Sequence, residues 1–138
     1  MAEPRSTPPI PFVHSTPIFC VKNGARALEF YVDVLGFEIS WQWSDDEGFD
    51  GGAPTFACVR RGDVAIFLGE ERQGNPGAWV MVNVPTAADV DRVCAEVRAR
   101  GAEILEEPDD CSWGMREVWI KDLDGNVLRI GAPSPEAG

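Results

Sequence analysis

Gly36-Phe37-Glu38-Ile39 is the stretch that decides the fold, because it returns in the second half of the chain as Gly101-Ala102-Glu103-Ile104. Each copy follows apolar residues at helical spacing, and its glycine stands where a helix ends. Each copy also leads into alternating, apolar-rich segments that are typical of strands. The sequence therefore predicts one structural module that occurs twice.

The predicted elements have the same order in both halves. In the first half, strands are expected over 16–21, 37–43, 55–60 and 64–68, with the helix after the first strand. In the second half, strands are expected over 79–84, 103–105, 116–121 and 127–130. The second helix should begin at a capping box formed by Thr86 and Asp89. The acidic segments 44–52 and 106–114 are predicted to be loops.

Two β-α-β-β-β modules in an α+β fold follow from this order. The modules cover 14–69 and 77–132 and together form a single domain over 14–132, with a linker between them. Residues 1–13 form a proline-rich N-terminal arm, because proline favours extended backbone and cannot donate to a strand ladder. Residues 133–138 form a short tail.

Composition excludes several classes of protein. The chain has 138 residues, enough for one domain with a real core, and a net charge of −11 that argues against nucleic-acid binding. No apolar run is long enough to span a membrane, and the amino terminus does not resemble a signal peptide. The four cysteines are widely spaced without a CxxC motif, so we expect reduced, mostly buried thiols and a cytoplasmic protein.

The paired modules carry a family resemblance. The segment from Ala27 to Phe37, which includes Leu35-Gly36-Phe37, resembles the first-module signature of the vicinal oxygen chelate superfamily, and Lys121-Asp122-Leu123-Asp124-Gly125-Asn126 resembles its last-hairpin signature. The superfamily contains glyoxalases, extradiol dioxygenases and bleomycin resistance proteins. The resemblance covers residues 14–132 and implies a curved mixed sheet around a groove. It does not fix the chemistry, because this fold hosts many functions.

The resemblance also implies where a metal would be bound. In the metal-dependent members one ligand comes from each of four strands, and in this chain those positions are Thr16, Phe67, Trp79 and Arg129. None is a usual ligand, and arginine does not give up its proton to become one. The only histidine, His14, lacks the rest of a ligand set. We therefore expect no metal and no cofactor.

Strand alternation separates an aliphatic face from an aromatic one. The aliphatic set, which includes Val80, Val82, Val118 and Ile120, should pack under the helices. The other face should line the groove with Phe67, Trp79, Met81 and Trp119, ringed by the polar residues Asn83, Glu117 and Arg129. Such a lining suits a flat aromatic ligand that stacks on tryptophan.

Further tryptophan and acidic residues are candidates for the border of the groove. Trp113 could close one end, Trp43 could be groove or core, and Trp41 is expected to be core. Asp45 and Asp46 in the first acidic segment, with carboxylates of the second, could attract a cation, although a solvated charged loop explains any single one. If Arg129 points inward, a cationic ligand requires a carboxylate such as Glu117 to neutralise it.

These features resemble the metal-free bleomycin resistance proteins. The resemblance implies a homodimer with two grooves between subunits, which binds and sequesters a planar, cationic antibiotic without chemistry. A related planar drug could fill the same groove, and the arm could be exchanged between subunits or be a tail. Two alternatives stay open: a glyoxalase- or dioxygenase-type enzyme with a shifted metal site at His14 and Glu117, and a regulatory module whose groove takes a metabolite.

Overall fold

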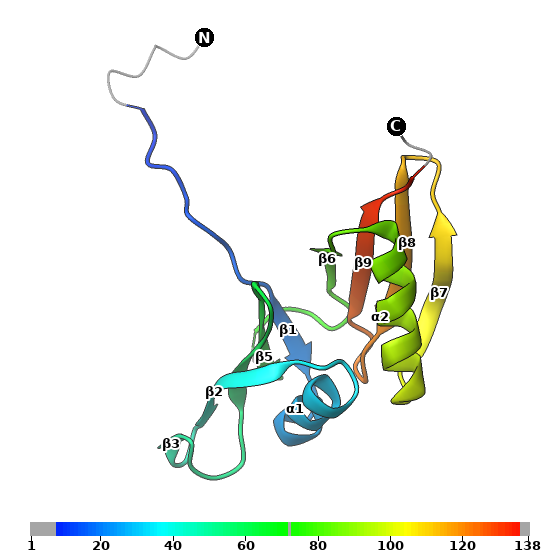
Figure 1. Ribbon diagram of the computed structural model, residues 1–138. Coiled ribbons are helices and arrows are strands. Elements are labelled where there is room, and N and C mark those ends of the chain that lie inside the picture. Colours follow the sequence, from blue (N-terminus) through cyan, green and yellow to red (C-terminus); the bar gives the residue numbers. More distant parts are fainter. Residues whose placement is uncertain (1–7, 72, 136–138) are drawn as a thin grey trace.

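The computed structural model describes residues 8–71 and 73–135 and consists of two open sheets, each with one helix (Figure 1). The first module contains β1 (Ile18–Val21), α1 (Gly24–Asp33), β2 (Glu38–Ser44), β3 (Gly48–Phe49), β4 (Phe56–Arg61) and β5 (Val64–Glu70). The second contains β6 (Trp79–Asn83), α2 (Ala87–Ala99), β7 (Glu103–Asp110), β8 (Met115–Lys121) and β9 (Val127–Pro133). The predicted α+β fold is confirmed.

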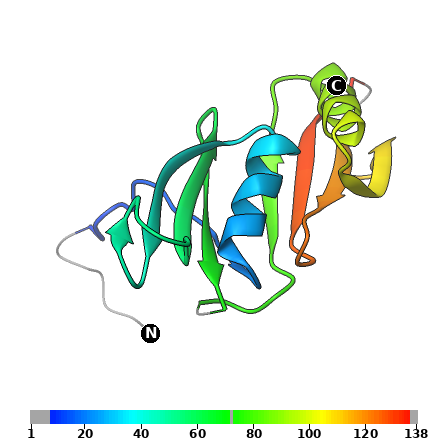
Figure 2. The ribbon, with the colours of Figure 1, turned by 90° about the horizontal axis from the view of Figure 1, so that it is seen from below.

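The two sheets share one topology. The first has the strand order β1-β5-β4-β2-β3 and the second β6-β9-β8-β7. In each sheet the strand before the helix pairs in parallel with the last strand of its module, and the other neighbours are antiparallel. Figure 2 shows the two groups of strands beside each other, as two open sheets. Each module thus leaves one sheet face without a helix over it.

Helix boundaries agree with the sequence signals. Asn23 caps α1, and Thr86 and Asp89 form the predicted capping box of α2. Gly36 and Gly101 follow the two helices with φ values of 75° and 97°, a conformation that favours glycine. Each helix therefore stops where the chain must turn back into its sheet.

The core lies on the helix-covered faces and joins both modules. Its fully buried members include Phe19 and Ile66 in the first module and Val118 and Ile120 in the second. The predicted aliphatic set of the second module packs there, so the separation of the two faces is confirmed for β6, β8 and β9. Three cysteines are buried, Cys111 is half-buried, and all four are free thiols.

A buried polar network fastens the two modules to each other. The Tyr31 hydroxyl on α1 donates to Asp122 Oδ2 in the β8–β9 turn at 2.9 Å. Asn126 Nδ2 donates to the same oxygen at 2.9 Å and to the Cys20 carbonyl oxygen on β1 at 3.2 Å. Burial, and then the Asp122 carboxylate, raise the pKa of Tyr31 well above its ordinary value. The phenol therefore stays a donor.

The segment predicted as a second acidic loop is instead mostly strand. β7 continues through Asp110 and pairs with β8, which otherwise would expose its backbone groups at the sheet edge. Charged residues and Pro108 are poor strand formers, but they are the residues that natural edge strands carry because they discourage pairing with another chain. The composition that suggested a loop is therefore that of a protected edge.

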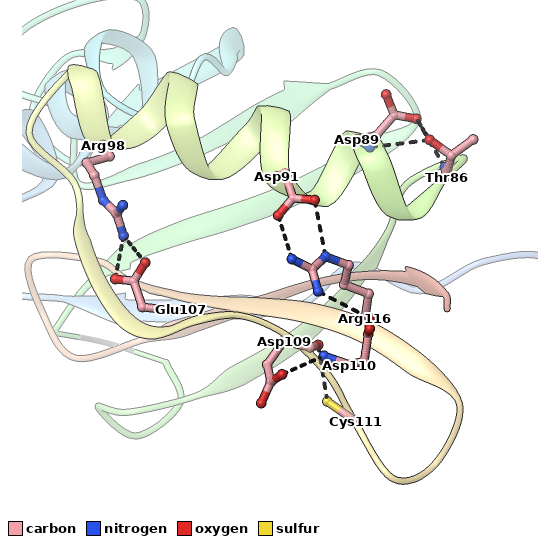
Figure 3. Close-up of polar contacts among 9 residues, drawn as sticks. All are labelled: Thr86, Asp89, Asp91, Arg98, Glu107, Asp109, Asp110, Cys111 and Arg116. Atoms are coloured by element: carbon pink, nitrogen blue, oxygen red, sulfur yellow. Dashed lines mark hydrogen bonds and ion pairs between the residues drawn. The ribbon is translucent and has the colours of Figure 1, made fainter. Parts of the chain in front are cut away.

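Ion pairs hold the helix side of this edge strand. Glu107 pairs with Arg98 on α2, and Arg116 on β8 bridges Asp91 on α2 and Asp110 on β7 (Figure 3). These hydrogen bonds raise the pKa of Arg116 above its ordinary value, although burial opposes them. Two of the acidic side chains of β7 are thus already neutralised.

Residues 8–17 form no helix or strand and lead away from the folded body (Figure 1). Ile10, Phe12 and Val13 are 85%, 98% and 90% exposed. The predicted arm over 1–13 lies partly outside the described residues. The predicted first strand begins at Ile18, so Thr16 precedes it. In the described part of the chain, no helix is long and apolar enough to cross a membrane.

Candidate ligand-binding surfaces

The helix-free face of the second sheet carries most of the predicted site residues. The strand register places Met81, Arg129, Trp119 and Glu106 side by side across the four strands. The neighbouring row holds Asn83, Gly131, Glu117 and Asp109. We call the residues Trp79, Met81, Trp113, Glu117, Trp119 and Arg129 the tryptophan surface. The register thus places Met81, Glu117, Trp119 and Arg129 on one face of the second sheet, with Trp79 on the same face of β6.

Glu117 lies at the centre of this surface and is only 3% exposed. Its Oε1 accepts hydrogen bonds from Trp119 Nε1 at 2.9 Å and Arg129 Nε at 2.8 Å. Its Oε2 accepts from Trp113 Nε1 at 2.8 Å and Arg129 Nη2 at 2.9 Å. Burial alone would raise the pKa of Glu117, but these hydrogen bonds together bring it below its ordinary value. The carboxylate is ionised and engaged at both oxygens.

Arg129 pairs with this carboxylate and lies next to two tryptophans. Its guanidinium carbon lies 5.3 Å from the centre of the Trp119 ring and 5.9 Å from that of Trp113, within reach of cation–π attraction. Its side chain is 33% exposed. The arrangement is therefore an internal ion pair, in which Glu117 neutralises Arg129 as a cationic ligand would require.

Trp79 and Trp113 offer the open aromatic area of the surface. They are 51% and 58% exposed, whereas Trp119 is half-buried and meets Trp79 edge-on at 5.2 Å between ring centres. A flat ring could stack on either exposed indole, since neither is covered in a single chain.

Two β-bulges bring carboxylates to the edge of the tryptophan surface. Between Ile104 and Asp109 the register of β7 shifts twice, so that Glu106 faces Trp119 and Asp109 faces Glu117. Figure 3 shows Asp109 pointing away from α2, opposite to the ion-paired side of the strand. Of the second acidic segment, Glu106 and Asp109 therefore border the tryptophan surface.

The first sheet carries a separate aromatic cluster, formed by Trp41, Trp43, Phe49, Phe56 and Phe67. Trp41 stacks on Phe56 with 5.8 Å between ring centres and meets Phe67 at 5.3 Å. A pocket of about 330 Å³ is lined by Trp41, Trp43, Phe49 and Phe56 and also by Asp45. We call this set the first-sheet cluster.

The expectation that Trp41 is core was wrong. Regular alternation would place Trp41 on the face of Ile39, but a bulge shifts the register between them. Ile39 faces Val59, while Trp41 faces Cys58, which is itself opposite Phe67. The bulge thus turns Trp41, and Trp43 after it, to the helix-free face.

Trp43 and the first acidic segment lie together beside this cluster. Trp43 is 37% exposed, and its indole N–H donates to Asp45 Oδ1 at 3.3 Å. Asp46 is exposed at the tight turn before β3, where its backbone N–H donates to Ser44 Oγ. Phe67 contacts this set rather than the tryptophan surface, and no described ring contact joins the two. The predicted site residues thus form two surfaces within one chain.

Gly131 is a site residue that sequence reasoning missed. A Cβ atom at this position would lie 2.6 Å from Met81 Cε and 3.0 Å from Glu117 Cγ. Its lack of a side chain lets Met81 and the buried carboxylate lie over β9. Sequence alone could not reveal this role, because Gly131 is next to Asn83 and Glu117 only through the pairing of β9 with β6 and β8.

The donor groups do not favour the shifted metal site. The oxygens of Glu117 already accept four N–H groups, and His14 is exposed on the segment before β1. Within residues 8–71 and 73–135, no three His, Cys, Asp or Glu side chains are grouped so that they could hold a metal ion.

A further cavity of about 490 Å³ lies on the helix side, between the modules. Its lining is mainly aliphatic and includes Leu35, Val82, Val97 and Ile120. It contains no tryptophan and so lacks the stacking groups of the helix-free faces.

The fold agrees with the comparisons to known proteins. A model of the glyoxalase/bleomycin resistance protein/dioxygenase superfamily matches residues 12–130, and the chain belongs to this family. The uncharacterized protein YraH of Bacillus subtilis (strain 168) is 28% identical over 116 residues, which are 80% of this chain and 90% of YraH.

Solved structures show the same fold. TioX from Micromonospora sp. ML1 is similar with a TM-score of 0.71 and 21% identity, covering 88% of this chain and all of TioX. TnmS3, an antibiotic binding protein from Streptomyces sp. CB03234, is similar with a TM-score of 0.62 and 24% identity, covering 88% of this chain and 98% of TnmS3.

Proposed function

We propose that this protein binds and sequesters a planar antibiotic of the bleomycin type that carries a cationic part, without chemical conversion. The observation that carries the proposal is the tryptophan surface, in which the indoles of Trp79 and Trp113 are exposed beside a neutralised ion pair. The similarity to TnmS3, an antibiotic binding protein, supports a small-molecule ligand. Its four free thiols suit the cytoplasm, where such a drug would be intercepted.

The groups have separate roles in this proposal. Trp79, Trp113 and Trp119 stack on the flat part of the drug, with Met81 and Asn83 beside them. Glu106 and Asp109 attract the cationic part, and Phe67, Trp43, Asp45 and Asp46 form a second wall. Because stacking removes apolar area from water, it supplies most of the affinity, whereas the acidic field mainly speeds association.

Titration with metal-free bleomycin in the presence of a chelator tests the proposal. We expect saturable quenching of tryptophan fluorescence at about one drug per protomer, weakened by salt because exposed charges are screened. Trp79→Ala should weaken binding by roughly tenfold, the loss of one stacking contact. Leu123→Ala, which removes an equally exposed apolar side chain in the β8–β9 turn, should leave the affinity unchanged. Absence of quenching at about 50 µM drug, far above a Kd of about 1 µM, would exclude bleomycin as the ligand.

We propose that the protein is a homodimer in which the first-sheet cluster of one protomer faces the tryptophan surface of the other. The two surfaces do not meet within one chain, and the exposed apolar residues of the arm, Ile10, Phe12 and Val13, are suited to cover a partner. The dimer would thus have two grooves.

Sedimentation equilibrium tests the dimer. We expect the mass of two protomers at micromolar concentration and a clear weakening of the dimer in Phe12→Ser, with Leu123→Ser as the matched control. A monomer that binds the drug with full affinity would contradict the shared grooves while leaving drug binding intact.

A further inference from the structure

One edge of the Arg129 guanidinium is a polar group of the tryptophan surface that has no partner among residues 8–71 and 73–135. Arginine has five N–H donors arranged as a rigid fork. The side facing Glu117 uses Nε and Nη2, which leaves both hydrogens of Nη1 and the second hydrogen of Nη2 on the other side. Among the described residues, no hydrogen bond or ion pair from Nη1 is found. This second edge can hold a carboxylate or two neighbouring oxygens bidentately.

The carboxylate of Glu117 cannot serve a ligand in the same way. It is nearly inaccessible, and each oxygen already accepts two N–H groups. One face of the Trp113 ring and one of the Trp119 ring are directed to Arg129, whose guanidinium carbon lies over both rings. A cationic ligand group placed here would meet a guanidinium instead of a free carboxylate. The centre of the surface therefore favours a ligand group that is anionic or accepts hydrogen bonds.

The acidic groups of the surface lie away from this centre. Glu106 is separated from Arg129 by Trp119 in the same row, two strands away, which is about 10 Å at the usual strand spacing. The row therefore presents a guanidinium, an indole and a carboxylate in sequence. A ligand lying over Trp119 could place an acceptor at one end and a cation at the other.

We propose that Arg129 recognises a hydrogen-bond-accepting group, a carboxylate or a pair of ring oxygens, on the planar part of the ligand. The ligand class is thus a planar aromatic compound with an acceptor on its ring system and its positive charge at a distance from it. This inference rests on the proposed binding of a planar ligand and adds which chemical group the centre selects.

Three planar probes of equal ring size test this selection: acridine carboxylate, methylacridine and aminoacridine, each substituted on the central ring. They are an anion, a neutral compound and a cation at neutral pH, and they absorb where tryptophan emits. Binding is measured by tryptophan quenching at physiological ionic strength, so that the overall negative charge contributes little. We expect the carboxylate to bind about tenfold more tightly than methylacridine, the effect of one charge-assisted contact.

Variants assign the preference to Arg129. Arg129→Lys keeps the positive charge beside Glu117 but loses the fork, and it should reduce the preference to a few-fold. Arg116→Gln removes an arginine on the helix side and should leave the preference unchanged. Equal binding of the carboxylate and methylacridine, or tightest binding of aminoacridine, would overturn this inference but not planar-ligand binding. Failure of all three probes and of bleomycin would instead overturn the proposed function.

Discussion

Glu117→Ala is expected to lower the free energy of unfolding by about 3 kcal/mol, the lower end of the range for breaking a buried ion pair. The substitution leaves the Arg129 charge and the indole N–H groups of Trp113 and Trp119 without their acceptor. The lower end applies because Arg129 keeps partial access to water. Denaturant unfolding monitored by circular dichroism measures the change.

Glu107→Ala is the matched control for this loss. It also removes a carboxylate that pairs with an arginine, but both partners are largely exposed. Exposed pairs contribute about 1 kcal/mol or less, so this variant should remain close to the parent protein. Equal losses in the two variants would show that the buried pair has no special role in stability.

The same carboxylate makes stability depend on pH. Its pKa is lower in the folded protein than the ordinary value of 4.5, so the unfolded chain binds the proton more readily. The contribution of Glu117 is therefore present above that ordinary value and is lost as the pH falls through the lowered pKa. Glu117→Gln, which cannot titrate, should lose stability less steeply than the parent protein as the pH falls below 4.5.

Asp122→Ala is expected to cost about 3 kcal/mol as well, for a different reason. The Asp122 carboxylate accepts from the Tyr31 hydroxyl and from Asn126 Nδ2, and also from the backbone N–H groups of Asp124 and Asn126. Removing it leaves several donors unsatisfied and breaks the contact of Tyr31 with the second module. Tyr31→Phe loses one of these bonds and should cost about 1 kcal/mol.

Thermal unfolding compares these variants with Asp124→Ala, whose carboxylate accepts only the exposed Lys22 N–H in the described contacts. We expect the melting temperature to fall in the order Asp124→Ala, Tyr31→Phe, Asp122→Ala. A melting temperature of Asp122→Ala equal to that of Asp124→Ala would show that the network does not hold the modules together.

Regular alternation made the second module predictable from sequence. Val80 and Val82 on β6, and Val118 and Ile120 on β8, face the core as their spacing indicated, so the positions of Trp79 and Trp119 followed. The family was likewise readable, because the helix-ending glycines and the last hairpin are local patterns.

Where strands contain β-bulges, regular alternation did not predict the faces of the side chains. The register shift after Ile39 places Trp41 on the face opposite to the one that regular alternation predicts. Two further shifts let the acidic residues of β7 pair with β8 as an edge strand instead of forming a loop. A bulge depends on how two strands pair, which single-strand periodicity does not contain. The contact between Trp113 and Glu117 was also hidden, because it joins a turn to a strand.

The bulge at Ser40 has a consequence for how members of this family diverge. Loss of Ser40 would remove the bulge, and regular alternation would then keep Ile39 and Trp41 on opposite faces, opposite their present partners Val59 and Cys58. A single codon deletion at this position could therefore leave the aromatic wall in place, whereas a deletion at a regularly paired position would shift the register by one residue. Homologues aligned without a gap at this point would be assigned the wrong pocket residues, even where the letters agree.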